Sequence, residues 1–265
     1  MSQSSFGNKF KVTTWGESHG KALGAVIDGC PAGLPLCEED IQKFLDRRKP
    51  GQSRYTTARK EGDLVEILSG VFEGKTTGTP ISLMVRNTDQ RSRDYGNIAY
   101  SYRPGHADYT FDQKYGFRDY RGGGRSSGRE TIGRVAAGAI ASKILEELGI
   151  SICTYTRSIG PVEIASFNKE EIHQNAFYMP DAQAAVKAGE YLEECMKNQD
   201  SAGGVIECRI TGTPAGLGEP VFDKLSALLA HALMSIGAVK AVEIGDGIAV
   251  TSSNGSTDND GFTVK

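Results

Sequence analysis

The chain has 265 residues, of which 38% are hydrophobic, and its 30 basic and 33 acidic side chains give a formal net charge of −3. This length suffices for a substantial core. No apolar run reaches membrane length, and the N-terminus lacks the basic and apolar stretches of a secretory signal. The composition predicts a soluble, cytoplasmic protein that binds neither membranes nor nucleic acids, because nucleic-acid-binding domains are usually basic overall.

The cysteines are odd in number and scattered along the chain. They are Cys30, Cys37, Cys153, Cys195 and Cys208. They form no CxxC pair and no Cys/His cluster at zinc spacing. We therefore expect free thiols in a reducing compartment, and no metal site.

The hydrophobic pattern predicts a mixture of strands and helices along the chain. Strands are expected at 10–14, 23–28, 65–71, 81–85, 150–157 and 205–211, and a strand with a turn at 240–247. Helices are expected at 38–49, 127–148, 181–196 and 220–236. Residues 87–102 and those from 251 onward are polar and predict loops. No repeat or linker divides the chain, so we expect one domain over residues 1–265.

The most informative stretch is Arg121–Arg134, with the sequence RGGGRSSGRETIGR. Three glycines permit a sharp turn and close approach of a ligand. Ser127 and Glu130 then fit the capping box that opens a helix. A helix N-terminus surrounded by arginines is a typical anion site. The alternative is a solvated, arginine-rich turn before an ordinary core helix.

Basic residues also gather at 47–60 and 86–103, which on a mildly acidic protein favours a small anionic ligand. Two histidines lie in glycine-bounded loops, His19 in GESHG and His106 in RPGHAD. Either could transfer a proton beside a bound anion. Asp108 could orient His106, which could equally be a turn histidine bonded to local backbone. The neighbours Ser18 and His19 do not predict a hydrolase, because no GxSxG elbow is present.

Three stretches, 16–36, 103–141 and 230–247, closely resemble the chorismate synthase family. The resemblance implies an α+β fold, a β-α-β sandwich with helices packed between two antiparallel sheets, assembled as a homotetramer. It also implies a lyase that converts 5-enolpyruvylshikimate 3-phosphate to chorismate and phosphate by 1,4-anti elimination, in the shikimate pathway to the aromatic amino acids. Reduced FMN is the implied cofactor, with NADPH as a possible reductant.

The resemblance also assigns roles to individual residues. His19 matches the histidine that protonates the departing phosphate, and His106 matches the one held near the flavin. The implied substrate contacts are Ser18, Arg48, Arg54, Arg103 and Arg129. The implied cofactor contacts are Arg48, Arg54, Arg125, Ser126, Ser127, Gly237 and Ala238. Gly237 stands where the family often has Asn or Pro.

The chain stops before the last motifs of the family, so we expect a C-terminally incomplete chorismate synthase that holds FMN poorly and does not turn over. A phosphate-binding module without catalysis is the alternative, and it predicts strongly salt-dependent binding of polyanions. A P-loop phosphotransferase is excluded because no GxxxxGK[ST] occurs.

Overall fold

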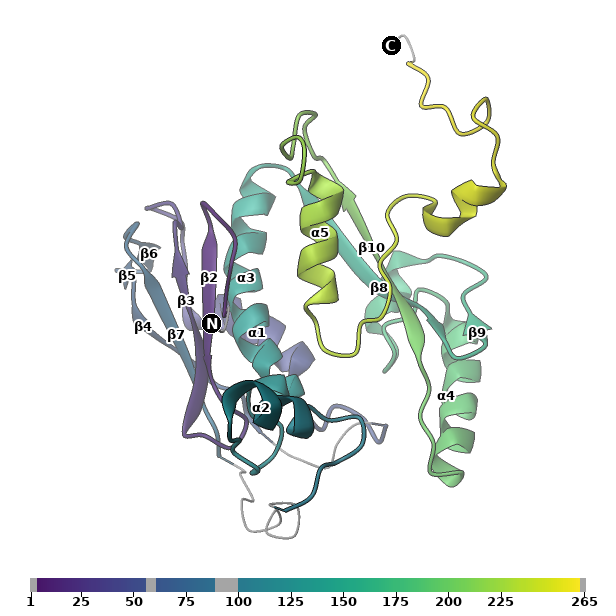
Figure 1. Ribbon diagram of the computed structural model, residues 1–265. Coiled ribbons are helices and arrows are strands. Elements are labelled where there is room, and N and C mark those ends of the chain that lie inside the picture. Colours follow the sequence, from purple (N-terminus) through teal and green to yellow (C-terminus); the bar gives the residue numbers. More distant parts are fainter. Residues whose placement is uncertain (1–3, 56–60, 89–99, 263–265) are drawn as a thin grey trace. The chain divides into compact units, whose positions relative to one another are not determined.

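The structure is a computed structural model that describes residues 4–55, 61–88 and 100–262. The chain divides into two compact units, Met1–Thr213 and Pro214–Lys265. Each unit is described by itself below. Figure 1 shows the elements of both along the chain.

The first unit begins with an antiparallel sheet of five strands in the order β1-β2-β3-β7-β4. The strands are β1 (Ser5–Phe6), β2 (Lys11–Gly16), β3 (Ala22–Asp28), β4 (Val65–Ser69) and β7 (Ile81–Arg86). β3 and β7 each place an apolar residue at every second position, so one face of the sheet is apolar. The register pairs Leu23 with Val85 and Ala25 with Leu83, all of which are buried.

Two helices cover this apolar face, α1 (Glu38–Arg48) and α3 (Thr131–Glu147) (Figure 1). Ile41 and Leu45 of α1 and Ile132 and Ile140 of α3 join the sheet residues in one core. α3 approaches the sheet closely at Gly133, where an added Cβ would lie 2.9 Å from the carbonyl oxygen of Gly24. This end of α3 carries the glycine-rich segment, so close packing fixes that segment against the sheet.

A second antiparallel sheet has the order β10-β8-β9, formed by β8 (Ser151–Ile159), β9 (Val162–Glu163) and β10 (Gly204–Thr211). The helix α4 (Ala182–Lys197) contacts β9, and its alanines contribute to a smaller core with Met179. Asp181 caps α4 by accepting from the backbone N–H groups of Gln183 and Ala184. A short hairpin, β5 (Val71–Phe72) and β6 (Lys75–Thr76), completes the strands of this unit.

The second unit contains α5 (Leu225–Met234) and a 3-10 helix, Gly247–Ser252. The predicted helix over 220–236 is therefore too long at both ends. Of the strand and turn predicted over 240–247, the strand is wrong, since 240–244 form irregular chain, and the turn is confirmed at 245–246. A strand needs a neighbour to complete its backbone hydrogen bonds, and the described part of this unit contains no other strand.

The strands and helices predicted in the first unit are confirmed to within a few residues. One helix was not predicted, α2 (Asp108–Tyr115), whose aromatic and polar residues have little helical periodicity. Among the described residues, no helix is both long and apolar enough to cross a membrane. Nor do these residues include a group of three or more His, Cys, Asp and Glu side chains placed to hold a metal ion.

Candidate active site

The glycine-rich segment enters α3 through two 3-10 turns, Gly124–Ser126 and Gly128–Glu130. The predicted cap at Ser127 is confirmed, because its hydroxyl accepts from the backbone N–H of Arg129. The reciprocal half of the capping box is wrong. The Glu130 carboxylate instead accepts from the Thr14 hydroxyl at 2.8 Å and from Arg134 Nε at 2.8 Å. Glu130 thus ties the start of α3 to β2.

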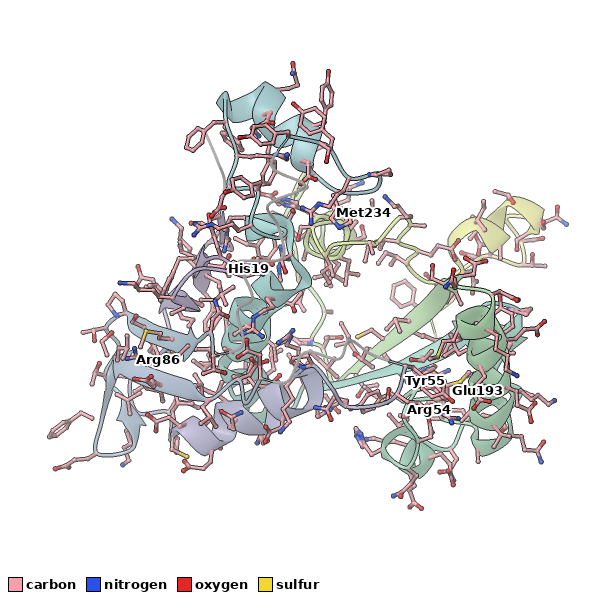
Figure 2. All side chains as sticks on the ribbon, turned by 90° about the horizontal axis from the view of Figure 1, so that it is seen from below. His19, Arg54, Tyr55, Arg86, Glu193 and Met234 are labelled. Carbon is pink, nitrogen blue, oxygen red and sulfur yellow. The ribbon has the colours of Figure 1, made fainter. Side chains whose placement is uncertain are left out.

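His19 lies against this glycine-rich turn, although more than a hundred residues separate them in the sequence (Figure 2). A Cβ added to Gly122 would lie 2.2 Å from His19 Nδ1, so only glycine leaves room for the ring. Gly122 also has φ = +83°, a conformation that glycine adopts readily. On its other side, His19 Nδ1 lies 3.1 Å from the hydroxyl oxygen of buried Ser18. The two neighbouring side chains therefore interact directly.

The RPGHAD motif reaches the same turn through Arg103. The Arg103 guanidinium donates to both carboxylate oxygens of buried Asp108 at 2.8 Å and to the carbonyl oxygen of Gly122 at 3.0 Å. Hydrogen bonds from Arg103 hold the pKa of Asp108 well below its usual range. Asp108 therefore orients Arg103 and not His106, which corrects the expected pairing.

His106 itself is exposed. Its Nδ1 lies 3.0 Å from the carbonyl oxygen of Pro104, as expected for a turn histidine bonded to local backbone. A carbonyl oxygen only accepts, so Nδ1 donates in this hydrogen bond and Nε2 takes no part in it. This geometry leaves Nε2 able to exchange a proton with a ligand.

Arg129 and Arg48 meet at one buried carboxylate, Asp63. Arg48 Nη1 donates to Asp63 Oδ2 at 2.5 Å, and Arg129 Nη1 lies 3.1 Å from Asp63 Oδ1. A second buried carboxylate, Glu61, lies 4.0 Å from Arg129 Nη2. Asp63 has φ = +46°, so its backbone adopts a conformation that few non-glycine residues take. Such strain is typical of residues whose position matters for a site.

The Arg129 guanidinium is unusual for a buried cation. The side chain is only 6% exposed, and its Nε donates to Asn87 Oδ1 at 3.0 Å. Nη1 and Nη2 are buried without a well-aligned hydrogen bond to any described residue. Nη1 and Asp63 Oδ1 are both buried and 3.1 Å apart, so they form an ion pair without an aligned hydrogen bond. Nη2, which lies 4.0 Å from Glu61, is the nitrogen left to donate to an anionic ligand such as a phosphate or a carboxylate.

The predicted cofactor contacts around the turn have other partners. Arg125 donates to the carbonyl oxygens of Gly16 and Thr14 at 3.0 and 3.2 Å and to the Thr14 hydroxyl at 2.7 Å. Its guanidinium therefore anchors the turn to β2. The Ser126 hydroxyl donates to the carbonyl oxygen of Gly123 and retains lone pairs that can accept. Gly237 and Ala238 lie in the second unit, where Ala238 has φ = +71°, and their assignment stays a prediction.

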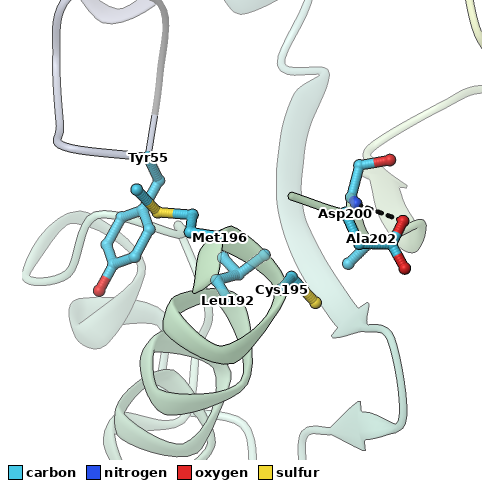
Figure 3. Close-up of a pocket in the computed structure, with 7 residues that line it drawn as sticks. Tyr55, Leu192, Cys195, Met196, Asp200 and Ala202 are labelled. Atoms are coloured by element: carbon cyan, nitrogen blue, oxygen red, sulfur yellow. Dashed lines mark hydrogen bonds between the residues drawn. The ribbon is translucent and has the colours of Figure 1, made fainter. Parts of the chain in front are cut away.

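The structure does not place Arg54 beside His19, Arg48 and Arg129. It forms an ion pair with Glu193 of α4, and Figure 2 shows the two beside α4 and apart from His19. Next to them, Tyr55, Leu192, Cys195, Met196 and residues 200–202 line a pocket of about 220 Å³ (Figure 3). The role predicted for Arg54 at the substrate stays a prediction.

Three residues of the site were missed by the sequence reasoning: Glu61, Asp63 and Asn87. Glu61 and Asp63 stand directly after the basic stretch 47–60. Two acids at that point were a detectable signal, because buried arginines need counter-ions. Asn87 gave no such signal, since nothing in the sequence shows that it contacts two distant segments.

The structure is an α+β protein in which a histidine and several arginines gather at a glycine-rich turn. The family profile described as chorismate synthase matches residues 10–265. The chain therefore belongs to the chorismate synthase family, whose members are lyases.

Individual relatives agree with the family assignment. The chain is 69% identical to the chorismate synthase of Agathobacter rectalis over 264 residues, which cover 99% of this chain and 72% of that protein. It is 67% identical to the chorismate synthase of Lachnoclostridium phytofermentans over 264 residues, with the same two coverages. A solved crystal structure of chorismate synthase superimposes with a TM-score of 0.79 at 34% identity, covering 96% of this chain and 74% of that one. The predicted α+β fold class is confirmed.

Proposed function

We propose that this site converts 5-enolpyruvylshikimate 3-phosphate to chorismate and inorganic phosphate by 1,4-anti elimination. The observation that carries the proposal is the buried Arg129 guanidinium, whose Nη2 has no acceptor within hydrogen-bond distance among the described residues. The substrate has a phosphate and two carboxylates, and arginine binds such groups through paired donors. Membership of the chorismate synthase family supports this choice of anion.

Each of the converging side chains has a task in this reaction. Arg129 and Arg48, held by Asp63, bind the anionic groups of the substrate, while Arg103 fixes the turn through the Gly122 carbonyl. His19, placed over that turn, donates a proton to the phosphate oxygen as the carbon–oxygen bond breaks. The ring carbon gives its proton to a base, the electron pair of that C–H bond becomes part of the new double bonds, and the C–O pair leaves with the phosphate, so the reaction involves no net oxidation.

Reduced FMN is the cofactor that the family implies, and when bound it supplies electron density that assists loss of phosphate. The residues present fit a phosphate-bearing cofactor at the glycine-rich turn. The Ser126 and Ser127 hydroxyls lie there, and a Cβ at Gly124 would meet open space. His106, whose side chain is exposed, is proposed to hold a proton at Nε2 beside the cofactor. NADPH as reductant, a homotetramer and a cytoplasmic location remain part of the same proposal.

The test places His19→Ala and His106→Ala in the enzyme at the full length of its relatives, of which this chain covers 72%. Each variant is compared with the parent of that length in the release of phosphate, using chemically reduced FMN in excess. Each variant should lower turnover by about 10²–10⁴-fold, the usual range for a positioned proton donor. Binding of inorganic phosphate, measured by calorimetry, should change little. His173→Ala is the matched control, because His173 is exposed beside Tyr178.

The lyase and the phosphate-binding module predict different outcomes of this test. A variant of His19 that keeps turnover within threefold would remove that residue from the mechanism. A parent protein that binds phosphate and releases none from the substrate would favour the binding module over the enzyme.

A further inference from the structure

Asn87 connects two parts of the site that come from distant segments of the chain. It follows the last residue of β7 and is half-buried. Its side-chain Nδ2 donates to the carbonyl oxygens of Glu17 at 3.0 Å and Gly20 at 2.8 Å. These two carbonyls flank Ser18 and His19, so a single amide closes the loop that carries the histidine.

The other end of the same amide accepts from Arg129. Asn87 Oδ1 receives a hydrogen bond from Arg129 Nε at 3.0 Å. The orientation of the amide follows from chemistry, because carbonyl oxygens only accept and an arginine Nε only donates. Rotating the amide by 180° would lose all three hydrogen bonds.

The backbone on either side of Asn87 is fixed as well. Its own N–H donates to the carbonyl oxygen of Lys21 at 3.1 Å, which extends the pairing of β3 with β7. The next residue, Thr88, donates from its backbone N–H and its hydroxyl to buried Glu61 at 3.0 and 2.7 Å. These backbone hydrogen bonds fix the position of the Asn87 side chain, so it does not move with the His19 loop or with Arg129.

We propose that Asn87 is a positioning residue that sets the distance between the His19 loop and the Arg129 guanidinium. The inference rests on the proposed function, which assigns the proton transfer to His19 and the anion to Arg129. Asn87 contacts neither substrate nor cofactor in this proposal. It acts by keeping His19, the proton donor, at a fixed distance from Arg129, which binds the anion. A displacement of about 1 Å in such a site is enough to lower the rate about 10²-fold.

The experiment uses two variants that separate the donor function of the Asn87 amide from its acceptor function. Asn87→Ala removes both donors and the acceptor. Asn87→Asp keeps an acceptor for Arg129 but turns an oxygen toward the Glu17 and Gly20 carbonyls, which repels them. Both should lower kcat by about 10- to 100-fold, because both release the His19 loop. KM should rise less in Asn87→Asp than in Asn87→Ala, since Arg129 keeps its partner.

The matched control is Asn175→Ala. The Asn175 amide also donates to two carbonyl oxygens, those of Glu171 and Met179, and accepts from backbone N–H groups, but it belongs to the segment before α4. The thermal unfolding midpoint of the Asn175→Ala variant should fall about as far as that of Asn87→Ala, and its kcat should stay unchanged. Equal loss of kcat in this control would reduce Asn87 to a contributor to stability and overturn the inference.

Proton NMR gives a second readout that does not require turnover. The chain has four histidines, so the His19 ring signal can be assigned by comparison with His19→Ala. That signal should shift or broaden in both Asn87 variants and stay unchanged in Asn175→Ala. An unmoved signal, together with a kcat within threefold of the parent, would overturn the inference. If the parent itself releases no phosphate, the proposed function fails, while the NMR result still decides whether Asn87 anchors the loop.

Discussion

The two histidines occupy similar sequence contexts and different structural ones. Both lie in short loops beside glycine, and the same family resemblance assigns both to proton transfer. His19 is enclosed by Ser18 and the Gly122 backbone, in a loop closed by Asn87. His106 is exposed, and its ring is hydrogen-bonded to the nearby carbonyl oxygen of Pro104. The comparison shows that similar short motifs can hold a histidine in different ways. Segments remote in sequence position His19, and its own motif does not reveal them.

The largest change should come from breaking the anchor of the His106 turn. Asp108→Asn leaves Arg103 without its counter-ion, and breaking a buried pair costs about 3–5 kcal/mol of unfolding free energy. In the parent, the pKa of Asp108 is lowered in the folded state by hydrogen bonds from Arg103. The Asp108 contribution is therefore complete above the unfolded pKa of about 4 and is lost as the pH falls below it. Urea unfolding at pH 7 and at pH 3 measures this, and an equal cost of the substitution at both pH values would contradict it.

Gly122→Ala should affect His19 more than it affects stability. The substituted residue keeps φ near +83°, which costs an alanine about 1–2 kcal/mol, and its methyl group displaces the His19 ring. Turnover should therefore fall about 10²-fold. Gly116→Ala is the control, because Gly116 has the same φ of +83° and open space at its Cβ. It should lose similar stability and keep its turnover. Equal turnover in the two variants would mean that the position of His19 is unimportant.

The smallest effect is expected at Asp119, which pairs with Arg121 on the surface beside His19. Asp119 accepts from Arg121 at 2.8 and 2.6 Å, and these bonds, with a minor contribution from His19, lower the pKa of its carboxyl group. The pair is partly exposed, so Asp119→Asn should cost less than about 1 kcal/mol of stability. Thermal unfolding in low and high salt would test this. A loss above 2 kcal/mol would show that the His19 region depends on surface charge as well as on buried contacts.

Local sequence patterns were sufficient for most of the fold and for only part of the site. β3, β7 and α3 were predicted correctly because alternation and helical periodicity report burial on one face. The segment 240–247 was misassigned because strand propensity does not reveal whether a partner strand exists. In the site, the glycine-rich turn and the cap at Ser127 were predictable. The partners of Arg125 and Arg129 lie about 110 and 40–70 residues away, and such pairings leave no local pattern.

The cluster around Asp63 has a consequence for how the enzyme meets its substrate. The described charges of Arg48 and Arg129 are balanced by those of Asp63 and Glu61, two positive against two negative. This cluster therefore adds little long-range field of its own and contributes little to the diffusional steering of an anion. Recognition by this cluster then depends on hydrogen bonds that form once the anion has reached the site. Selectivity among anions is expressed chiefly in the dissociation rate, which is lowest for the correct substrate.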